Sequence, residues 1–88
     1  MTVVPTFTAV SVNGDTASSQ TRTLSFPPGT QVVLTVEEQP RYPWNGDWRS
    51  PDPAKLCNGT VGVAPGFSMT FSSLQQDVVC EAFAGFSD

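Results

Sequence analysis

Alternation of apolar and polar residues with a period of two is the pattern that most constrains the fold of this chain. Residues 30–36 (TQVVLTV) alternate in this way, and residues 67–72 (FSMTFS) do so with Phe67, Met69 and Phe71 on one face. Successive side chains of a strand point to opposite faces, so each run predicts a half-buried β-strand. No window carries an apolar stripe of period 3.6, so we expect little helix.

Three further segments, residues 6–12, 21–26 and 78–84, are also expected to be strands. In the last of these, Val78, Cys80 and Ala82 share one face, and Phe83 is expected to belong to the core. Turn residues separate the runs at positions 13–15 (NGD), 27–29 (PPG) and 65–66 (PG). Short strands between such turns predict one all-β domain over residues 1–88, an antiparallel β-sandwich of about six to eight strands.

The size of the chain and its two cysteines bear on stability. A chain of 88 residues supports one core, burying roughly 60% of the surface that its unfolded form exposes. Cys57 and Cys80 stand 23 positions apart, and a disulfide between them would stabilise the fold by roughly 3 kcal/mol. Two buried free thiols are the alternative. Two cysteines without a histidine are too few for a structural zinc site within one chain.

The charge balance argues against two classes of partner. The formal net charge is -4, whereas nucleic-acid binding needs a basic surface that displaces counterions from phosphates. No run of about 18 apolar residues is present, so we expect no insertion into a membrane. The acidic balance otherwise bears on solubility and selects no partner.

The residue types that catalysis needs are scarce. The chain has no histidine, the commonest general base, and no glycine-rich phosphate loop. Glu37 and Glu38 are adjacent and would point to opposite faces of a strand. Asp47 and Asp52 lie among turn residues, where aspartate is favoured for local hydrogen bonds, and their spacing matches no known calcium loop. We therefore expect a protein that is not an enzyme and that holds no cofactor or metal.

The segment from Pro40 to Lys55 breaks the alternation and concentrates recognition chemistry. It holds both tryptophans, the only tyrosine and three of the four basic residues, and its four prolines predict a long, stiff loop. Trp, Tyr and Arg carry much of the binding energy at protein interfaces. The candidate partner-binding residues are Arg41, Tyr42, Trp44, Trp48 and Arg49, together with Phe86 near the carboxyl end.

Two other roles for the same aromatic residues stay open. Exposed rings of Trp44, Trp48 and Tyr42 could form a platform on which sugar rings stack, as in a secreted carbohydrate-binding module. One tryptophan could instead fold back as a cover on the core, which small domains often need. These roles differ in whether the indoles face solvent.

Two parts of the chain resemble the immunoglobulin pattern. Residues 73–82 (SLQQDVVCEA) resemble the segment in which Leu and Asp precede a cysteine-bearing strand, and the Pro-Gly before residues 30–36 resembles the approach to an early core strand of that family. In this chain, Cys57 stands later than the usual partner cysteine. The resemblance implies a sandwich of immunoglobulin-like or jelly-roll-like type.

In size and character, the chain is similar to the small β-rich decoration (cement) proteins of bacteriophage capsids. The resemblance implies a structural protein that binds a larger protein assembly through residues 40–55 and its termini, with homo-oligomeric or lattice contacts. The amino-terminal residues lack a basic start and an apolar stretch, so we expect either a chain that is made without export or a mature form that carries an added start methionine. The expected location is a virion surface, or the extracellular space if the chain is not encoded by a phage.

Overall fold

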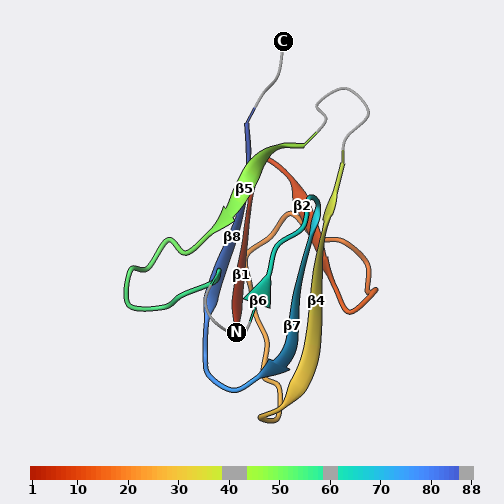
Figure 1. The fold of residues 1–88 in the computed structure, drawn as a ribbon. Coiled ribbons are helices and arrows are strands. Elements are labelled where there is room, and N and C mark those ends of the chain that lie inside the picture. Colours follow the sequence, from red (N-terminus) through yellow and green to blue (C-terminus); the bar gives the residue numbers. More distant parts are fainter. Residues whose placement is uncertain (39–43, 59–61, 86–88) are drawn as a thin grey trace.

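The computed structural model describes residues 1–38, 44–58 and 62–85, which form two four-stranded sheets packed face to face (Figure 1). Sheet A has the order β3 (Arg22–Thr23), β1 (Thr2–Thr6), β8 (Val79–Gly85), β5 (Asn45–Arg49). Sheet B has the order β2 (Ala9–Val12), β4 (Thr30–Glu37), β7 (Ser68–Leu74), β6 (Gly62–Val63). The prediction of an all-β sandwich is confirmed. In the described part of the chain, no helix is long and apolar enough to cross a bilayer.

Neighbouring strands are antiparallel except β1 and β8, which run parallel with Val3 opposite Cys80. This pair departs from the expected antiparallel arrangement. After β1 the chain crosses to sheet B through Phe7 and Thr8, and there it forms β2. The place beside β1 in sheet A is therefore filled by a strand from the far end of the sequence (Figure 1).

The core lies between the sheets and is built from the inward positions of their central strands. The predicted alternation of residues 30–36 is confirmed, because Val32, Leu34 and Val36 are buried while their neighbours are not. On β7, Met69 and Phe71 are fully buried. Each such side chain contributes about 1.5–3 kcal/mol of hydrophobic stabilisation, so these inward rows hold the two sheets together.

Two predicted placements of phenylalanine side chains are wrong. Phe67 lies before the first residue of β7 and is 42% exposed, so it does not share the buried face of Met69. Phe83 lies on the outer face of β8 and not in the core. Cys80 and Ala82 occupy the inward positions of β8, and the strand alternation then directs Phe83 outward.

Strand β5 lies inside the segment that was expected to be loop. It pairs with β8 over five residues, from Asn45 opposite Gly85 to Arg49 opposite Glu81. Gly46 permits this close approach, because a Cβ atom at this position would lie 1.6 Å from the carbonyl oxygen of Phe83. Among the described residues, Pro51 and Pro53 follow this strand, so the segment is not one continuous loop.

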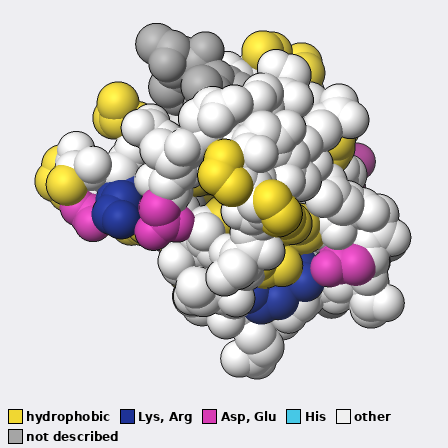
Figure 2. Space-filling view, turned by 90° about the horizontal axis from the view of Figure 1, so that it is seen from below, with side chains coloured by type: hydrophobic (Ala, Val, Ile, Leu, Met, Phe, Trp, Pro, Cys, Tyr) yellow, Lys and Arg dark blue, Asp and Glu magenta, His cyan; other side chains and the backbone are white. Residues whose placement is uncertain are grey.

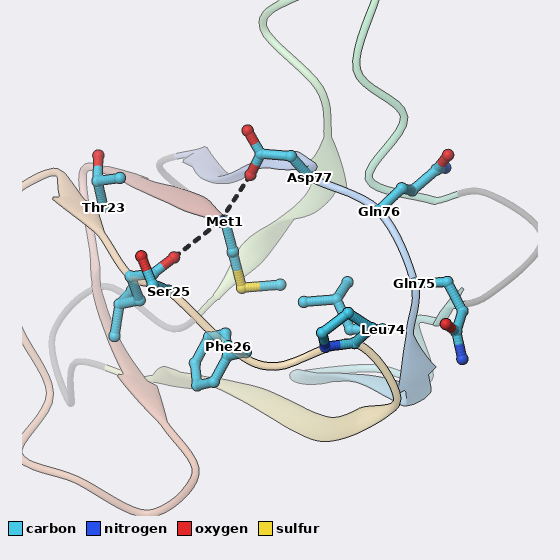
Figure 3. A pocket seen from close by; sticks show the side chains of 10 residues that line it. Met1, Thr23, Ser25, Phe26, Leu74, Gln75, Gln76 and Asp77 are labelled. Atoms are coloured by element: carbon cyan, nitrogen blue, oxygen red, sulfur yellow. Dashed lines mark hydrogen bonds and ion pairs between the residues drawn. The ribbon is translucent and has the colours of Figure 1, made fainter.

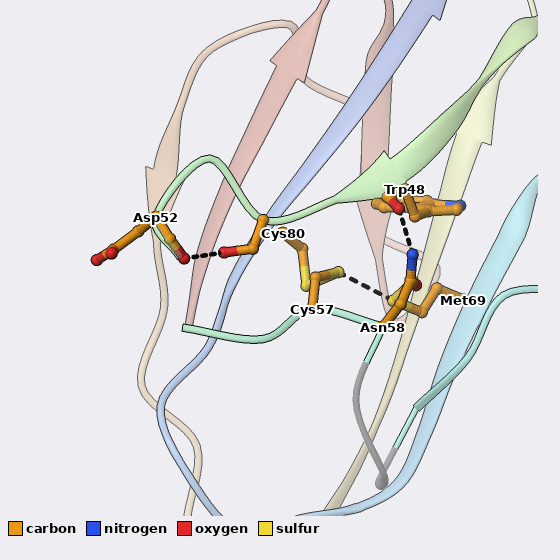
Figure 4. Close-up of a disulfide and its surroundings, with 7 residues drawn as sticks. Trp48, Asp52, Cys57, Asn58, Met69 and Cys80 are labelled. Carbon is orange, nitrogen blue, oxygen red and sulfur yellow. Dashed lines mark hydrogen bonds between the residues drawn. A yellow bond between two sulfur atoms is a disulfide. The ribbon is translucent and has the colours of Figure 1, made fainter. Parts of the chain in front are cut away.

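The disulfide between Cys57 and Cys80 is confirmed, with 4.8 Å between their Cα atoms (Figure 4). It ties β8 to the segment that follows β5. Next to it, the Asn58 side-chain amide donates a hydrogen bond to the main-chain oxygen of Trp48. The Cys57 sulfur also lies 3.1 Å from the Met69 sulfur, and because a disulfide sulfur carries no hydrogen this is a packing contact. Sheet A is thereby anchored to the core of sheet B.

Candidate functional site

Trp48 lies in the core, contrary to the prediction that it anchors a partner. Its side chain is 3% exposed and occupies the inward side of β5, opposite the buried Ala82. Its indole N–H has no acceptor among the described residues. The alternative prediction, in which one tryptophan folds back to cover the core, is therefore confirmed for Trp48. The Trp48 ring is not available to a protein or a sugar.

Trp44 lies at the surface end of the same segment, just before β5. Its ring packs against the edge of the core and against Phe67, with 5.5 Å between the ring centroids and 59° between the planes. The main-chain oxygen of Phe67 accepts a hydrogen bond of 2.9 Å from the Val36 N–H. Because Trp44 leads into sheet A and Phe67 leads into sheet B, this Trp44–Phe67 pair bridges the two sheets at one end of the sandwich.

Arg49 lies on the outer face of sheet A and is held in a fixed orientation. Its guanidinium carbon sits 4.2 Å from the centroid of the Phe83 ring, and its Nε donates a 2.6 Å hydrogen bond to Glu81 Oε1. The other Glu81 oxygen accepts a 2.8 Å hydrogen bond from the Thr6 hydroxyl. Burial raises the pKa of Glu81, but the hydrogen bonds from Arg49 and Thr6 and the charge of Arg49 outweigh it, so the pKa is lowered overall.

Phe7 stands beside this group and was not a candidate from the sequence. Its ring is 62% exposed and meets the ring of Phe83 edge-on, with 6.1 Å between centroids and 72° between planes. Its backbone has φ of 62°, a left-handed conformation that costs a bulky residue about 1–3 kcal/mol. The alternation along the strand does not predict the exposure of Phe7, because Phe7 forms the corner at which the chain crosses from sheet A to sheet B. For Phe83, the alternation set by the disulfide-bonded Cys80 is a signal that could have placed it outward.

The charges of the described residues are unevenly paired. Every basic group forms an ion pair: Arg22 with Asp15 at 2.8 Å, Arg49 with Glu81 at 2.6 Å, and both Lys55 and the Met1 ammonium with Asp77 at 3.2 and 2.7 Å. The remaining described carboxylates form no ion pair with a described residue; they are Glu37, Glu38, Asp47 and Asp52. The described surface therefore carries its unpaired charge as carboxylate.

Two of these carboxylates, Asp47 and Asp52, lie on different parts of the chain. Asp47 lies on β5, whereas the Asp52 carboxylate accepts a 2.9 Å hydrogen bond from the Ala54 N–H in the turn that follows, as expected for a turn residue. No group of three His, Cys, Asp or Glu side chains among residues 1–38, 44–58 and 62–85 could hold a metal ion.

Two hollows mark the described surface. One of about 390 Å³ lies where β1 begins, and Figure 2 shows hydrophobic side chains gathered there with charged side chains on either side. In Figure 3, Asp77 at the rim of this hollow points to the Met1 ammonium, so the two charged groups form an ion pair with each other. The second, of about 370 Å³, lies beside the exposed ring of Phe7. The second hollow thus adjoins the outward aromatic residues.

The structure separates the candidate partner-binding residues into three groups. Trp44 and Arg49 lie at the surface on different parts of the sandwich, and Trp48 is internal. Arg41, Tyr42 and Phe86 lie outside the described residues. In comparisons with known proteins, no family model, no curated protein and no solved structure matches this chain.

Proposed function

We propose that this chain is a non-enzymatic interaction protein that binds a larger protein assembly, and that the assembly is a virus capsid which the chain decorates. The observation that carries the proposal is the Trp44–Phe67 pair, an aromatic contact across the ends of both sheets in which Phe67 is 42% exposed and Trp44 is partly buried. Large aromatic side chains bury much area at low conformational cost, and they dominate binding energy at protein interfaces.

The positions of the two rings support this role. Phe67 is held by the start of β7 and Trp44 by the start of β5, so both rings are fixed by strands before a partner arrives. Fixing side chains in advance lowers the entropy lost on binding. Arg41 and Tyr42 precede Trp44 directly in the sequence, and we keep them as predicted contacts together with Phe86.

Other support comes from the sequence. The lack of histidine favours a role in which contact, and not chemistry, is the function. The immunoglobulin-like or jelly-roll-like kinship rests on the two sequence patterns described above and belongs to this proposal. We do not propose carbohydrate binding, because the burial of Trp48 removes one of the three rings on which sugars would stack.

Co-sedimentation tests the proposal. Purified chain is mixed with assembled capsids of the virus that encodes it and, separately, with free shell subunits, and we expect binding to the capsids alone. Trp44→Ala and Phe67→Ala are each expected to weaken this binding by about 2 kcal/mol, or roughly 30-fold. Leu56→Ala is the matched control, because Leu56 is 59% exposed and lies outside the Trp44–Phe67 pair.

The result that contradicts the proposal is equally specific. If both aromatic variants fold as the parent does and occupy capsids at the parent's level, the Trp44–Phe67 pair is not a binding surface. If the parent chain sediments with neither capsids nor subunits, the proposed assembly is wrong. Urea unfolding of each variant separates lost binding from lost folding, since Trp44 also packs on the core.

A further inference from the structure

The hollow where β1 begins combines buried apolar side chains with polar ones (Figure 3). Two main-chain hydrogen bonds join its residues Met1 and Leu24: the Leu24 N–H donates to the Met1 oxygen at 2.7 Å, and the Met1 ammonium donates to the Leu24 oxygen at 2.8 Å. Its volume of about 390 Å³ is within the range of pockets that bind small ligands. The hollow therefore has room for a large apolar side chain, and its own apolar lining is Met1, Leu24, Phe26, Pro28 and Leu74.

The ion pairs at the rim of this hollow leave one positive charge unbalanced. Asp77, which lines the hollow, pairs with both the Met1 ammonium at 2.7 Å and the Lys55 ammonium at 3.2 Å. Among the described residues, neither cation has a second carboxylate as an ion-pair partner. The Lys55 side chain is 38% exposed, so a carboxylate from outside has access to it. The hollow is therefore complementary to an apolar side chain that has a carboxylate close by.

The residues at the carboxyl end of the sequence have this combination. Phe86 is followed two positions later by Asp88, and none of the other five phenylalanines has a carboxylate at this spacing. In an extended segment, residues two positions apart lie on the same side, about 7 Å from each other. Phe86 and Asp88 are therefore matched to the apolar lining and to the excess positive charge at the rim.

Phe86 does not reach the hollow of its own chain. The hollow lies at the start of β8, because residues 74–77 line it and Val79, the first residue of β8, pairs with Thr2. Phe86 directly follows Gly85, the last residue of the same strand. Seven strand residues span about 20 Å, and Figure 1 shows the end of β8 at the opposite end of the sandwich from the amino terminus. A Phe86 ring that fills the hollow therefore comes from a second copy.

We propose that copies of this chain associate head to tail, with Phe86 of one copy in the hollow beside Met1 of the next. Asp88 of the first copy then pairs with Lys55 of the second, which shares its own carboxylate partner with another cation. The contact joins two different surfaces, so it repeats from copy to copy and builds rows or rings. One inserted ring and one ion pair bury little area, so the contact is weak in dilute solution.

Sedimentation velocity over a series of protein concentrations tests the inference. The parent chain is expected to form dimers and larger species as its concentration rises. Phe86→Ala removes the inserted ring, and Ser25→Trp fills the hollow from an exposed lining position. Each should lower the association constant at least about tenfold, because each prevents the burial of one phenylalanine ring. Val63→Ala is the matched control and should leave association unchanged, because Val63 is 64% exposed and does not line the hollow.

Charge reversal tests the ion pair separately from the ring. Lys55→Glu and Asp88→Lys should each weaken association by about threefold, the usual scale of an exposed ion pair. The chain that carries both substitutions should recover the association of the parent, because the opposite charges again face each other. A double variant that associates no better than either single variant would overturn the assignment of Asp88 to Lys55.

Mixing two variants shows the direction of the contact. Phe86→Ala keeps the hollow and Ser25→Trp keeps the ring of Phe86, so an equimolar mixture should form a dimer that grows no further. A parent that stays monomeric at every concentration, an unchanged association of Phe86→Ala, or a mixture without dimers would overturn the inference. Urea unfolding checks that each variant is folded. The Trp44–Phe67 pair takes no part in the contact, so any of these failures leaves the capsid proposal standing.

Discussion

The two outer faces of the sandwich differ in chemistry although the strands beneath them are alike. The central outward positions of sheet B are small and mostly hydroxylated, as in the contact of the Thr35 and Ser68 hydroxyls at 3.5 Å. The outward positions of sheet A carry a phenylalanine, an arginine and two carboxylates; they are Asp47, Arg49, Glu81 and Phe83. A hydroxylated face keeps a sheet soluble, whereas aromatic and arginine side chains are enriched where proteins bind. Under the proposed function, this difference favours the outer face of sheet A over that of sheet B as a surface that supports binding.

The largest effect on stability is expected from substitution of Trp48, which lies beneath the outer face of sheet A. Trp48→Ala should lower the free energy of unfolding by about 3–5 kcal/mol, because it leaves a large cavity under β5. Trp44→Ala should cost clearly less, since its ring is only partly buried. Urea unfolding of the two variants measures this difference. Similar losses of stability would show that the two indoles are not divided between core and surface.

The disulfide between Cys57 and Cys80 is expected to have the second-largest effect on stability. Replacing both Cys57 and Cys80 by alanine should lower the free energy of unfolding by roughly 3 kcal/mol, because the unfolded chain is no longer constrained. Thermal and urea unfolding of the double variant, compared with the oxidised parent, measure the change. An unchanged free energy of unfolding would mean that the bridge does not support β8.

The corner at Phe7 is expected to show a much smaller effect on stability. Phe7→Gly removes an aromatic contact worth about 0.5–1.5 kcal/mol, but it also relieves a left-handed backbone strain of about 1–3 kcal/mol. The free energy of unfolding should therefore stay within about 1 kcal/mol of the parent or rise. A loss of more than that in urea unfolding would mean that the packing of the Phe7 ring outweighs the strain of its backbone.

Lowering the pH should remove a small contribution of Glu81 to the free energy of unfolding, because its ion pair with Arg49 on the outer face of sheet A is lost. The pKa of Glu81 is lowered from its ordinary value of 4.5, so its ionised form contributes stability above that pH. This contribution is lost as the pH falls through the folded-state pKa. Because Arg49 is about half exposed, the contribution is at most about 1 kcal/mol. Urea unfolding between pH 7 and pH 3 should show a smaller loss for Glu81→Gln than for the parent.

A substitution on the outer face of sheet B is expected to have the smallest effect on stability and binding. Thr35→Val removes only a long hydroxyl contact, so stability should change by less than about 0.5 kcal/mol and co-sedimentation with capsids should not change. Urea unfolding and co-sedimentation measure the two quantities. A loss of capsid binding in this variant would place recognition on both faces and remove the contrast between them.

The sequence was sufficient where one local rule decides the outcome. Alternation at residues 30–36 fixed the inward row of β4, and the turn at Pro27–Gly29 forms as predicted, with Gly29 at φ of 87° and a 3.2 Å hydrogen bond from the Thr30 N–H to the Pro27 oxygen. The disulfide followed from the small size of the chain. These features depend on neighbours in the sequence or on a simple count.

The candidate site depends on pairing between distant parts of the chain, which residue patterns do not encode. Strand β5 exists because it pairs with β8, and this pairing turns Trp48 inward and Arg49 outward. The same pairing brings Arg49 against Phe83, and the crossing between sheets brings Phe7 against the Phe83 ring. Composition correctly marked this segment as unusual, but it did not distinguish a core ring from a surface ring.

Hydroxyl-radical footprinting of the chain, free and bound to assembled capsids, tests the central claim most directly, because aromatic rings react readily when exposed. We predict that Phe67 and Trp44 lose reactivity on binding, whereas Leu56 keeps the reactivity of its 59% exposed side chain and Trp48 stays unreactive in both states. Unchanged reactivity of Phe67 and Trp44 in a fully occupied complex would contradict the account.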